Sequence, residues 1–266
     1  MLLLRFIYKI KFFIGSKNDQ DKMFFFKKTA QYRHVKILTH HFSYFEMSNC
    51  PTQARQELLK KRFAIEYIRK PLLERFLRYV QIHTTSSEDA PPDQKPSTEI
   101  QLDLARILYK ELQELGISSE NISLDEHGCV LAKIPATPGY ENCPSILFNS
   151  HMDTSCACSG KDVKPQIHEN YDGQPINVGN GVVIDPKVMP SIKTAIGDTV
   201  ITSDGSTLLG ADDKCGVSEI MTFVDVILNH EKFDHGPIEI MFNCDEEIGH
   251  GTMYFPESKV DSKIAF

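Results

Sequence analysis

Three short stretches of the sequence carry histidine and acidic side chains at spacings that suit a metal site. The first contains His151 and Asp153, the second is Gly-Ala-Asp-Asp-Lys-Cys-Gly with Asp212, and the third is Asp-Glu-Glu with Glu246 and Glu247. One imidazole together with several carboxylates is a donor set for a borderline or hard cation. The set therefore indicates metal-dependent hydrolysis and does not fit a nucleophilic triad.

Two of these stretches directly follow short apolar runs. Residues 144–149 and 237–243 both end in Phe-Asn and are bounded by turn residues, which is typical of buried strands. Asp212 instead precedes a segment with apolar residues at helical spacing: Val217, Ile220, Met221, Val224, Ile227 and Leu228. In open α/β sheets, ligands sit beyond the carboxyl ends of the strands. Two strands and one helix start would thus bring the five side chains to one place.

Each motif also has an ordinary structural explanation when it is taken alone. Asp212 can cap the helix that comes after it by accepting bonds from free first-turn N–H groups. The Glu246–Glu247 pair can be a solvated turn, and Cys156-Ala-Cys158 without a second pair is a weak zinc signal. His168 and His250 are more typical of hydrogen-bonded or solvated histidines. The presence of all three acidic motifs in one chain favours the functional interpretation.

The three motifs also carry a family resemblance. His-Met-Asp-Thr, Gly-Ala-Asp-Asp-Lys-Cys-Gly and Asp-Glu-Glu-Ile-Gly-His-Gly stand in the order found in the dinuclear-zinc aminoacylase/carboxypeptidase superfamily. The sequence between them most resembles the peptidase T family of tripeptide aminopeptidases, from about residue 72 to about residue 255.

The resemblance implies a role for each candidate residue. Asp212 matches the carboxylate that bridges two zinc ions, His151 a terminal ligand of one zinc, and Glu247 a ligand of the other. Glu246 matches the catalytic general base, and Asp153 matches the aspartate that orients the histidine. The implied activity is zinc-dependent release of the N-terminal residue of a tripeptide, with a metal-activated water and two zinc ions in a complete site.

The resemblance also implies a fold class. We expect an α/β protein, a three-layer α/β/α zinc-peptidase catalytic domain with a mixed sheet, incomplete at its C-terminus. In the family a further carboxylate ligand, a lid and dimerisation domain and a last histidine ligand come after the Asp-Glu-Glu segment, and the sequence to residue 266 does not match them. Two alternatives stay open: a non-catalytic metal-binding remnant or half of a split enzyme, and a related zinc deacylase or carboxypeptidase.

Charge divides the chain into two parts. Residues 1–50 hold nine basic and three acidic residues, whereas the other 216 hold 20 and 33. We interpret 1–50 as a basic extension that is disordered, a targeting segment or the product of a mis-assigned start, and 51–266 as a partial zinc-peptidase catalytic domain. The acidic body argues against nucleic acid as a partner, and no apolar run has the length of a membrane span. The expected partner is a small peptide substrate, with a homodimer only if the lid domain is supplied.

Composition and periodicity predict the compartment and the remaining elements. Seven cysteines in no paired pattern favour reduced thiols and a cytoplasmic location. Residues 54–81 have a helical pattern that Pro71 should interrupt, and Thr98 with Gln101 should form a capping box for a helix that ends at Gly116. Residues 122–124 and 129–134 predict one hairpin, and 200–202 with 206–209 another.

Overall fold

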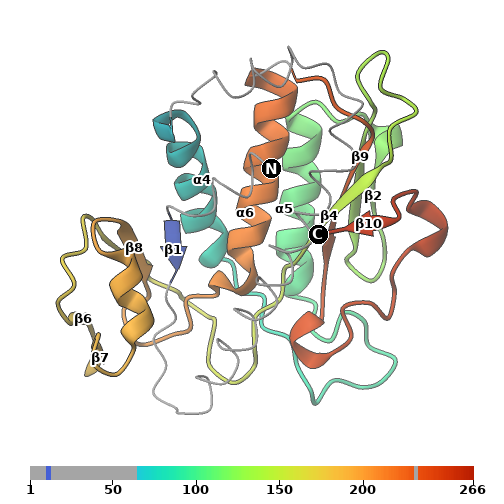
Figure 1. Ribbon diagram of the computed structural model, residues 1–266. Coiled ribbons are helices and arrows are strands. Elements are labelled where there is room, and N and C mark those ends of the chain that lie inside the picture. Colours follow the sequence, from blue (N-terminus) through green and yellow to red (C-terminus); the bar gives the residue numbers. More distant parts are fainter. Residues whose placement is uncertain (1–9, 13–64, 231–232) are drawn as a thin grey trace.

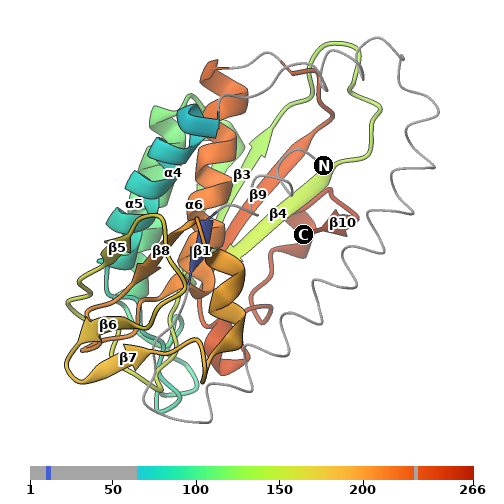
Figure 2. The ribbon, with the colours of Figure 1, turned by 60° about the vertical axis from the view of Figure 1, so that its left-hand side comes forward.

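A computed structural model describes residues 10–12, 65–230 and 233–266 (Figure 1). A five-stranded sheet lies at its centre in the order β10-β4-β9-β3-β2, and the helices α4 (Ile65–Val80), α5 (Gln101–Glu114) and α6 (Ala211–Asp225) cover one face (Figure 2). The described residues thus form two of the three layers expected for the fold. No described helix is long and apolar enough to cross a bilayer.

The central sheet is mixed, as expected. Strands β4 (Ile146–His151) and β9 (Ile238–Asn243) are parallel, with His151 opposite Asn243. Strand β3 (Val130–Ile134) is antiparallel to β9 and forms the predicted hairpin with β2 (Ile122–Leu124), while β10 (Ile264–Ala265) adds to β4 in parallel. Because β4 and β9 are parallel neighbours, their carboxyl ends meet at one edge of the sheet.

The main core lies between this sheet and the three helices. Every residue of β9 is buried, as the nearly continuous apolar run indicated. Apolar side chains from all three helices and three strands pack together there, among them Tyr79, Leu104, Leu108, Leu112, Val130, Val217, Met221, Ile240 and Phe242. A core of this kind fixes the strand ends relative to the start of α6.

Two details of the helices differ from the sequence predictions. Helix α4 continues through Pro71, so the predicted interruption is wrong. Although proline lacks a backbone N–H to donate within the helix, the buried residues Leu72, Phe76 and Val80 hold α4 in place, and α4 packs against α6. The capping box is also wrong, because the N-cap position of α5 is Ile100 and makes no side-chain capping bond. The predicted stop at Gly116 is confirmed, with a φ of 110° and a bond from the N–H of Ile117 to the carbonyl of Leu112.

Residues between β4 and α6 form a second, smaller region at one end of the molecule (Figure 1). Strand β8 (Thr199–Thr202) lies between β5 (Gln166–His168) and β1 (Ile10–Phe12), and β6 (Ile176–Gly179) pairs with β7 (Val182–Ile184). The hairpin predicted for 200–209 is wrong, because 206–209 forms no strand and β8 pairs with β1 and β5 instead.

The predictions for the N-terminal part of the chain fall mostly outside the described residues. Of the basic extension 1–50 the structure describes only β1, which pairs in parallel with β8. The start of the predicted helical stretch, before Ile65, also lies outside. The division at residue 50 therefore stays a prediction.

Candidate metal centre

The candidate ligands lie where the two parallel strands end and α6 begins. His151 is the last residue of β4, and after β9 the chain turns at Asp245, whose φ is 62°, into a short 3-10 helix at Glu246–Ile248. Asp212 has an extended conformation (φ −91°, ψ 102°) within the first turn of α6. Regular helical geometry begins after Asp213, so Asp212 lies on a turn between sheet and helix.

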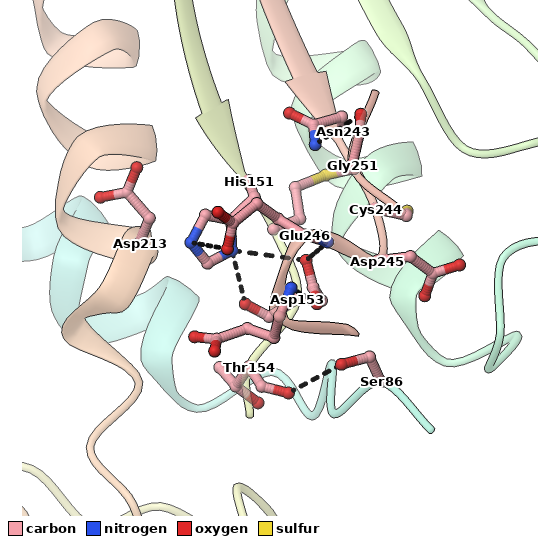
Figure 3. Close-up of polar contacts among 12 residues, drawn as sticks. Ser86, His151, Asp153, Thr154, Asp213, Asn243, Cys244, Asp245, Glu246 and Gly251 are labelled. Atoms are coloured by element: carbon pink, nitrogen blue, oxygen red, sulfur yellow. Dashed lines mark hydrogen bonds and ion pairs between the residues drawn. The ribbon is translucent and has the colours of Figure 1, made fainter. Parts of the chain in front are cut away.

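The side chains of His151, Asp153 and Glu246 lie close together (Figure 3). His151 Nε2 lies 3.0 Å from Asp212 Oδ1 and 3.5 Å from Glu246 Oε2. Ligand atoms of His151, Glu246 and Glu247 all lie within 4.8 Å of one another, and this is the one such group of three among the residues that the structure describes. The structure thus brings together the residues singled out from the sequence, while their separate roles stay predictions.

Asp153 connects the two strand ends. Its fully buried carboxylate accepts bonds from the backbone N–H groups of Glu246 (3.0 Å) and Glu247 (3.1 Å). His151 Nδ1 lies 3.0 Å from the backbone oxygen of Asp153 and 3.3 Å from its carboxylate. The shorter distance indicates that the backbone oxygen accepts the imidazole bond, and the carboxylate mainly holds the Glu246–Glu247 turn.

The site is strongly acidic and partly enclosed. Burial raises the pKa of Glu247 to about 7; His151 opposes this shift, and the carboxylates of Asp212, Asp153 and Glu246 add to it. Burial alone would lower the pKa of the His151 imidazole, but the neighbouring Asp153 and Asp212 raise it well above its usual value. Crowded carboxylates around one imidazole are an environment that a divalent cation would stabilise.

The donor set therefore fits a metal ion. A buried imidazole nitrogen and the carboxylate oxygens of separate acidic residues face one another, and nitrogen and oxygen donors of this kind suit zinc. The donor atoms within mutual reach belong to His151, Glu246 and Glu247, and Asp212 lies beside His151; which of them hold an ion stays a prediction. Asp153 fulfils the requirement that ligands be fixed by further hydrogen bonds, since it contacts both strand ends.

Other candidate side chains have structural partners. Asp213 accepts a bond from Ser150 Oγ (2.9 Å), and the buried Lys214 donates to the carbonyl of Ile82, with burial lowering the pKa of its ammonium to about 7. His168 contacts Thr202 Oγ1, His250 contacts Lys95 Nζ, and Asp261 pairs with Lys133. Cys156 and Cys158 are exposed and free.

Sequence reasoning missed the residues that support the Glu246–Glu247 turn from the start of α5 and from the segment between α4 and α5. Ser97 and Gln101 both bond the carboxylate of Asp245. Thr84 Oγ1 donates to the carbonyl of Met152, beside Asp153. A glutamine at the first position of an amphipathic helix was the available signal, but its spacing from Thr98 fits half of a capping box equally well.

Comparison with known proteins finds relatives that are named peptidase T. The chain is 47% identical over 197 residues to peptidase T of Caldanaerobacter subterraneus, covering 73% of this chain and 47% of that protein. It is 45% identical over 197 residues to peptidase T of Halothermothrix orenii, with the same coverage. No family model matches the chain.

The solved structure of aminopeptidase PepT from Bacillus cereus has a similar fold. It superposes with a TM-score of 0.51 at 25% identity, over 74% of this chain and 42% of that one. The chain spans about half the length of the curated relatives that it matches. Over the matched three quarters of its length, the chain is a homologue of peptidase T.

Proposed function

We propose that this chain carries the metal-binding part of a zinc-dependent aminopeptidase that releases the N-terminal residue of tripeptides. The observation that carries the proposal is the convergence of His151, Glu246 and Glu247 within 4.8 Å. Homology to peptidase T supports the substrate class. The acidic body argues against nucleic acid as a partner, and the free described cysteines support a cytoplasmic location.

His151, Asp212 and Glu247 would hold the metal, the role that the family resemblance implies for each of them. Bound zinc supplies Lewis-acid polarisation of a carbonyl and lowers the pKa of water. Asp153 keeps the imidazole of His151 and the backbone of Glu246 in fixed positions. Such fixed placement matters because an error of about 1 Å in a catalytic group can cost on the order of 100-fold in rate.

The two adjacent glutamates differ in exposure in a way that suits separate roles. The Glu246 side chain is 50% exposed and can reach a substrate, so it would take a proton from water and pass it to the leaving amine. Glu247 is half-buried among carboxylates, and its pKa is raised to about 7. A half-buried carboxylate in an acidic site gains more from a cation than from solvent, which favours Glu247 as the ligand.

Two substitutions test this division of roles. Hydrolysis of an unblocked tripeptide should be measured with added zinc and after chelation, for the chain alone and for the chain mixed with the remaining half of a related peptidase T. Glu246→Gln should lower kcat by about 10²- to 10⁴-fold and leave zinc content unchanged. Glu247→Gln should lose zinc together with activity.

The proposal is wrong if the active mixture hydrolyses tripeptides equally well after complete removal of metal. It is also wrong if Glu246→Gln retains full activity. A chain that binds zinc tightly but stays inactive in every mixture would favour a non-catalytic metal-binding protein, the alternative that the half-length match to its relatives keeps open.

A further inference from the structure

Gln101 is a fully buried polar residue at the start of α5, outside the candidate ligand set. Its side chain spans the gap between α5 and the turn after β9. Gln101 Nε2 donates to Asp245 Oδ1 at 2.7 Å, and Gln101 Oε1 accepts the backbone N–H of Asp245 at 3.1 Å. One amide side chain thus holds both the carboxylate and the backbone of Asp245.

Ser97 completes this contact. Its backbone N–H donates to Asp245 Oδ2 at 2.8 Å, and its hydroxyl donates to Asp245 Oδ1. The three side chains are each at most 4% exposed. A buried carboxylate needs such a set of donors, because an unpaired buried charge is strongly unfavourable.

The contact with Asp245 matters for the candidate metal centre because of where Asp245 lies in the chain. Asp245 directly precedes Glu246 and Glu247, and its φ of 62° aims the chain into the short 3-10 helix that carries them. Asp153 holds the N–H groups of the two glutamates from the other side. The Glu246–Glu247 turn is therefore fixed at two points, by Asp153 just after β4 and by Gln101 at the start of α5.

We infer that Gln101 is a positioning residue that sets the placement of Glu246 and Glu247 through Asp245, and thereby the metal affinity of the site. The inference rests on the proposed function for its consequence at the metal, but the contact itself is independent of any ion. This role of Gln101 also explains why the buried start of α5 carries a polar side chain. Loss of a contact that orients metal ligands lowers affinity by about 10- to 100-fold in known metal sites.

A swap of donor and acceptor tests the inference. Gln101→Glu places a second carboxylate against Asp245, and Asp245→Asn places an amide donor against the amide donor of Gln101. In the double variant the amide at 245 can donate to the carboxylate at 101, so the contact is restored with the net charge unchanged. Asn tolerates a positive φ as well as Asp does, so the backbone cost at 245 stays the same. Gln113→Glu is the matched control on the same helix, where the side-chain amide donates long bonds to Tyr109 and Ser119 at 3.3–3.4 Å.

Two readouts are measured on the full chain. Hydrogen exchange of the metal-free protein over residues 244–250 reports the contact directly, and titration with Zn²⁺ and the visible absorption of bound Co²⁺ report its effect on the site. Each single variant should exchange faster over 244–250 and bind Zn²⁺ about 10- to 100-fold more weakly. The double variant should recover both, and Gln113→Glu should change neither.

Distinct results separate the contact from its effect on the metal. Unchanged exchange in both single variants, or no recovery in the double variant, overturns the role of Gln101. Native protein that binds no Zn²⁺ overturns the proposed metal centre, while the exchange data still decide the contact. If Gln101→Glu does not fold, Gln101→Met, which keeps the volume and removes both bonds, takes its place with the same expected results.

Discussion

Asp153 is the residue through which the two parallel strands share one site. It is fully buried, two residues after the end-of-strand His151, and its carboxylate satisfies two N–H groups at the start of the 3-10 helix after β9. An aspartate accepts both bonds because it has two acceptor oxygens. An asparagine would turn one of these positions into a donor that faces another donor.

At the residue scale, Asp153→Asn should weaken zinc binding by about 10- to 100-fold, since the Glu246–Glu247 turn loses one of its anchors. Zinc titration of the purified chain measures this. Asp172→Asn is a suitable control, because Asp172 is exposed and its carboxylate accepts a local bond from the N–H of Gln174. Equal zinc affinity for Asp153→Asn and the native chain would show that Asp153 does not position the site.

At the scale of elements, the three helices are joined by one buried arginine. Arg75 of α4 is 8% exposed, and its guanidinium contacts Glu111 of α5 at 2.8 Å and Asp225 of α6 at 2.9 Å. Both carboxylates are themselves mostly buried. The contact ties α4 and α5 to α6, whose first turn carries Asp212, and so links helix packing to the geometry of the site.

Arg75→Met should therefore destabilise the fold by about 2–4 kcal/mol, because it removes the guanidinium from the largely buried Asp225, whereas Glu111 keeps its bond to Arg78. Chemical denaturation measures the change in the free energy of unfolding. Arg106→Met is the matched control on α5, where the pair with Asp103 is exposed on both sides, and it should change stability by less than about 0.5 kcal/mol. Similar effects for the two variants would contradict a special role for Arg75.

The C-terminal segment depends on a second buried charge. Glu239 of β9 is 2% exposed and accepts the N–H groups of Asp261 (3.0 Å) and Ser262 (2.7 Å), with Lys133 Nζ at 3.2 Å. Burial alone would raise the pKa of Glu239, but these donors lower it below its usual 4.5. The carboxylate is thus needed in its charged form.

The pKa of Glu239 is lower in the folded protein than in the unfolded chain, so the charged carboxylate stabilises the fold at pH values above its unfolded pKa. This stabilisation is lost as the pH falls through the folded pKa. Glu239→Gln should cost about 1–3 kcal/mol at neutral pH and should remove the part of acid destabilisation below pH 4.5 that arises from this group. Unfolding free energies measured from pH 3 to pH 7, together with hydrogen exchange over residues 256–266, check both effects. An unchanged pH profile in the variant would count against this assignment.

At the scale of the whole molecule, the number of potential ligands among the described residues limits the metal sites that these residues can form. The chain covers 47% of its peptidase T relatives. The described residues supply one group of three potential ligands, with Asp212 beside it. Two zinc ions with about four ligands each need more donors than these residues offer.

We therefore predict that the 266-residue chain alone binds zinc weakly and hydrolyses tripeptides far more slowly than an ordinary enzyme rate of about 10 per second. Steady-state assays with zinc and a tripeptide, with and without the remaining half of a related peptidase T, measure this. Metal occupancy and activity should rise together when that half is added. Turnover at an ordinary rate by the chain alone would mean that its own residues complete the site.

Much of the site was determined by the sequence itself. His151, Asp153, Glu246 and Glu247 lie at or just after the ends of apolar runs whose composition predicts buried strands, and parallel neighbouring strands bring the residues at their carboxyl ends to one edge of the sheet. The hairpin of β2 and β3 and the end of α5 at Gly116 were also predictable, because turns and helix stops depend on nearby residues. In each case the signal lay within a few residues of the feature.

Only the tertiary structure decided the contacts between distant parts of the chain. Gln101 contacts Asp245 across 144 positions, and Arg75 contacts Asp225 across 150. Contacts between distant parts of the chain also explain two of the wrong predictions. Pro71 stays within a helix because that helix packs on α6, and β8 pairs with β1 and β5 rather than with the residues that follow it. A local sequence pattern predicts the contacts that a residue makes with its neighbours in the sequence. The partner that it has in space depends on which buried polar groups the folded chain must satisfy, and that is fixed only when the helices and the sheet are packed together.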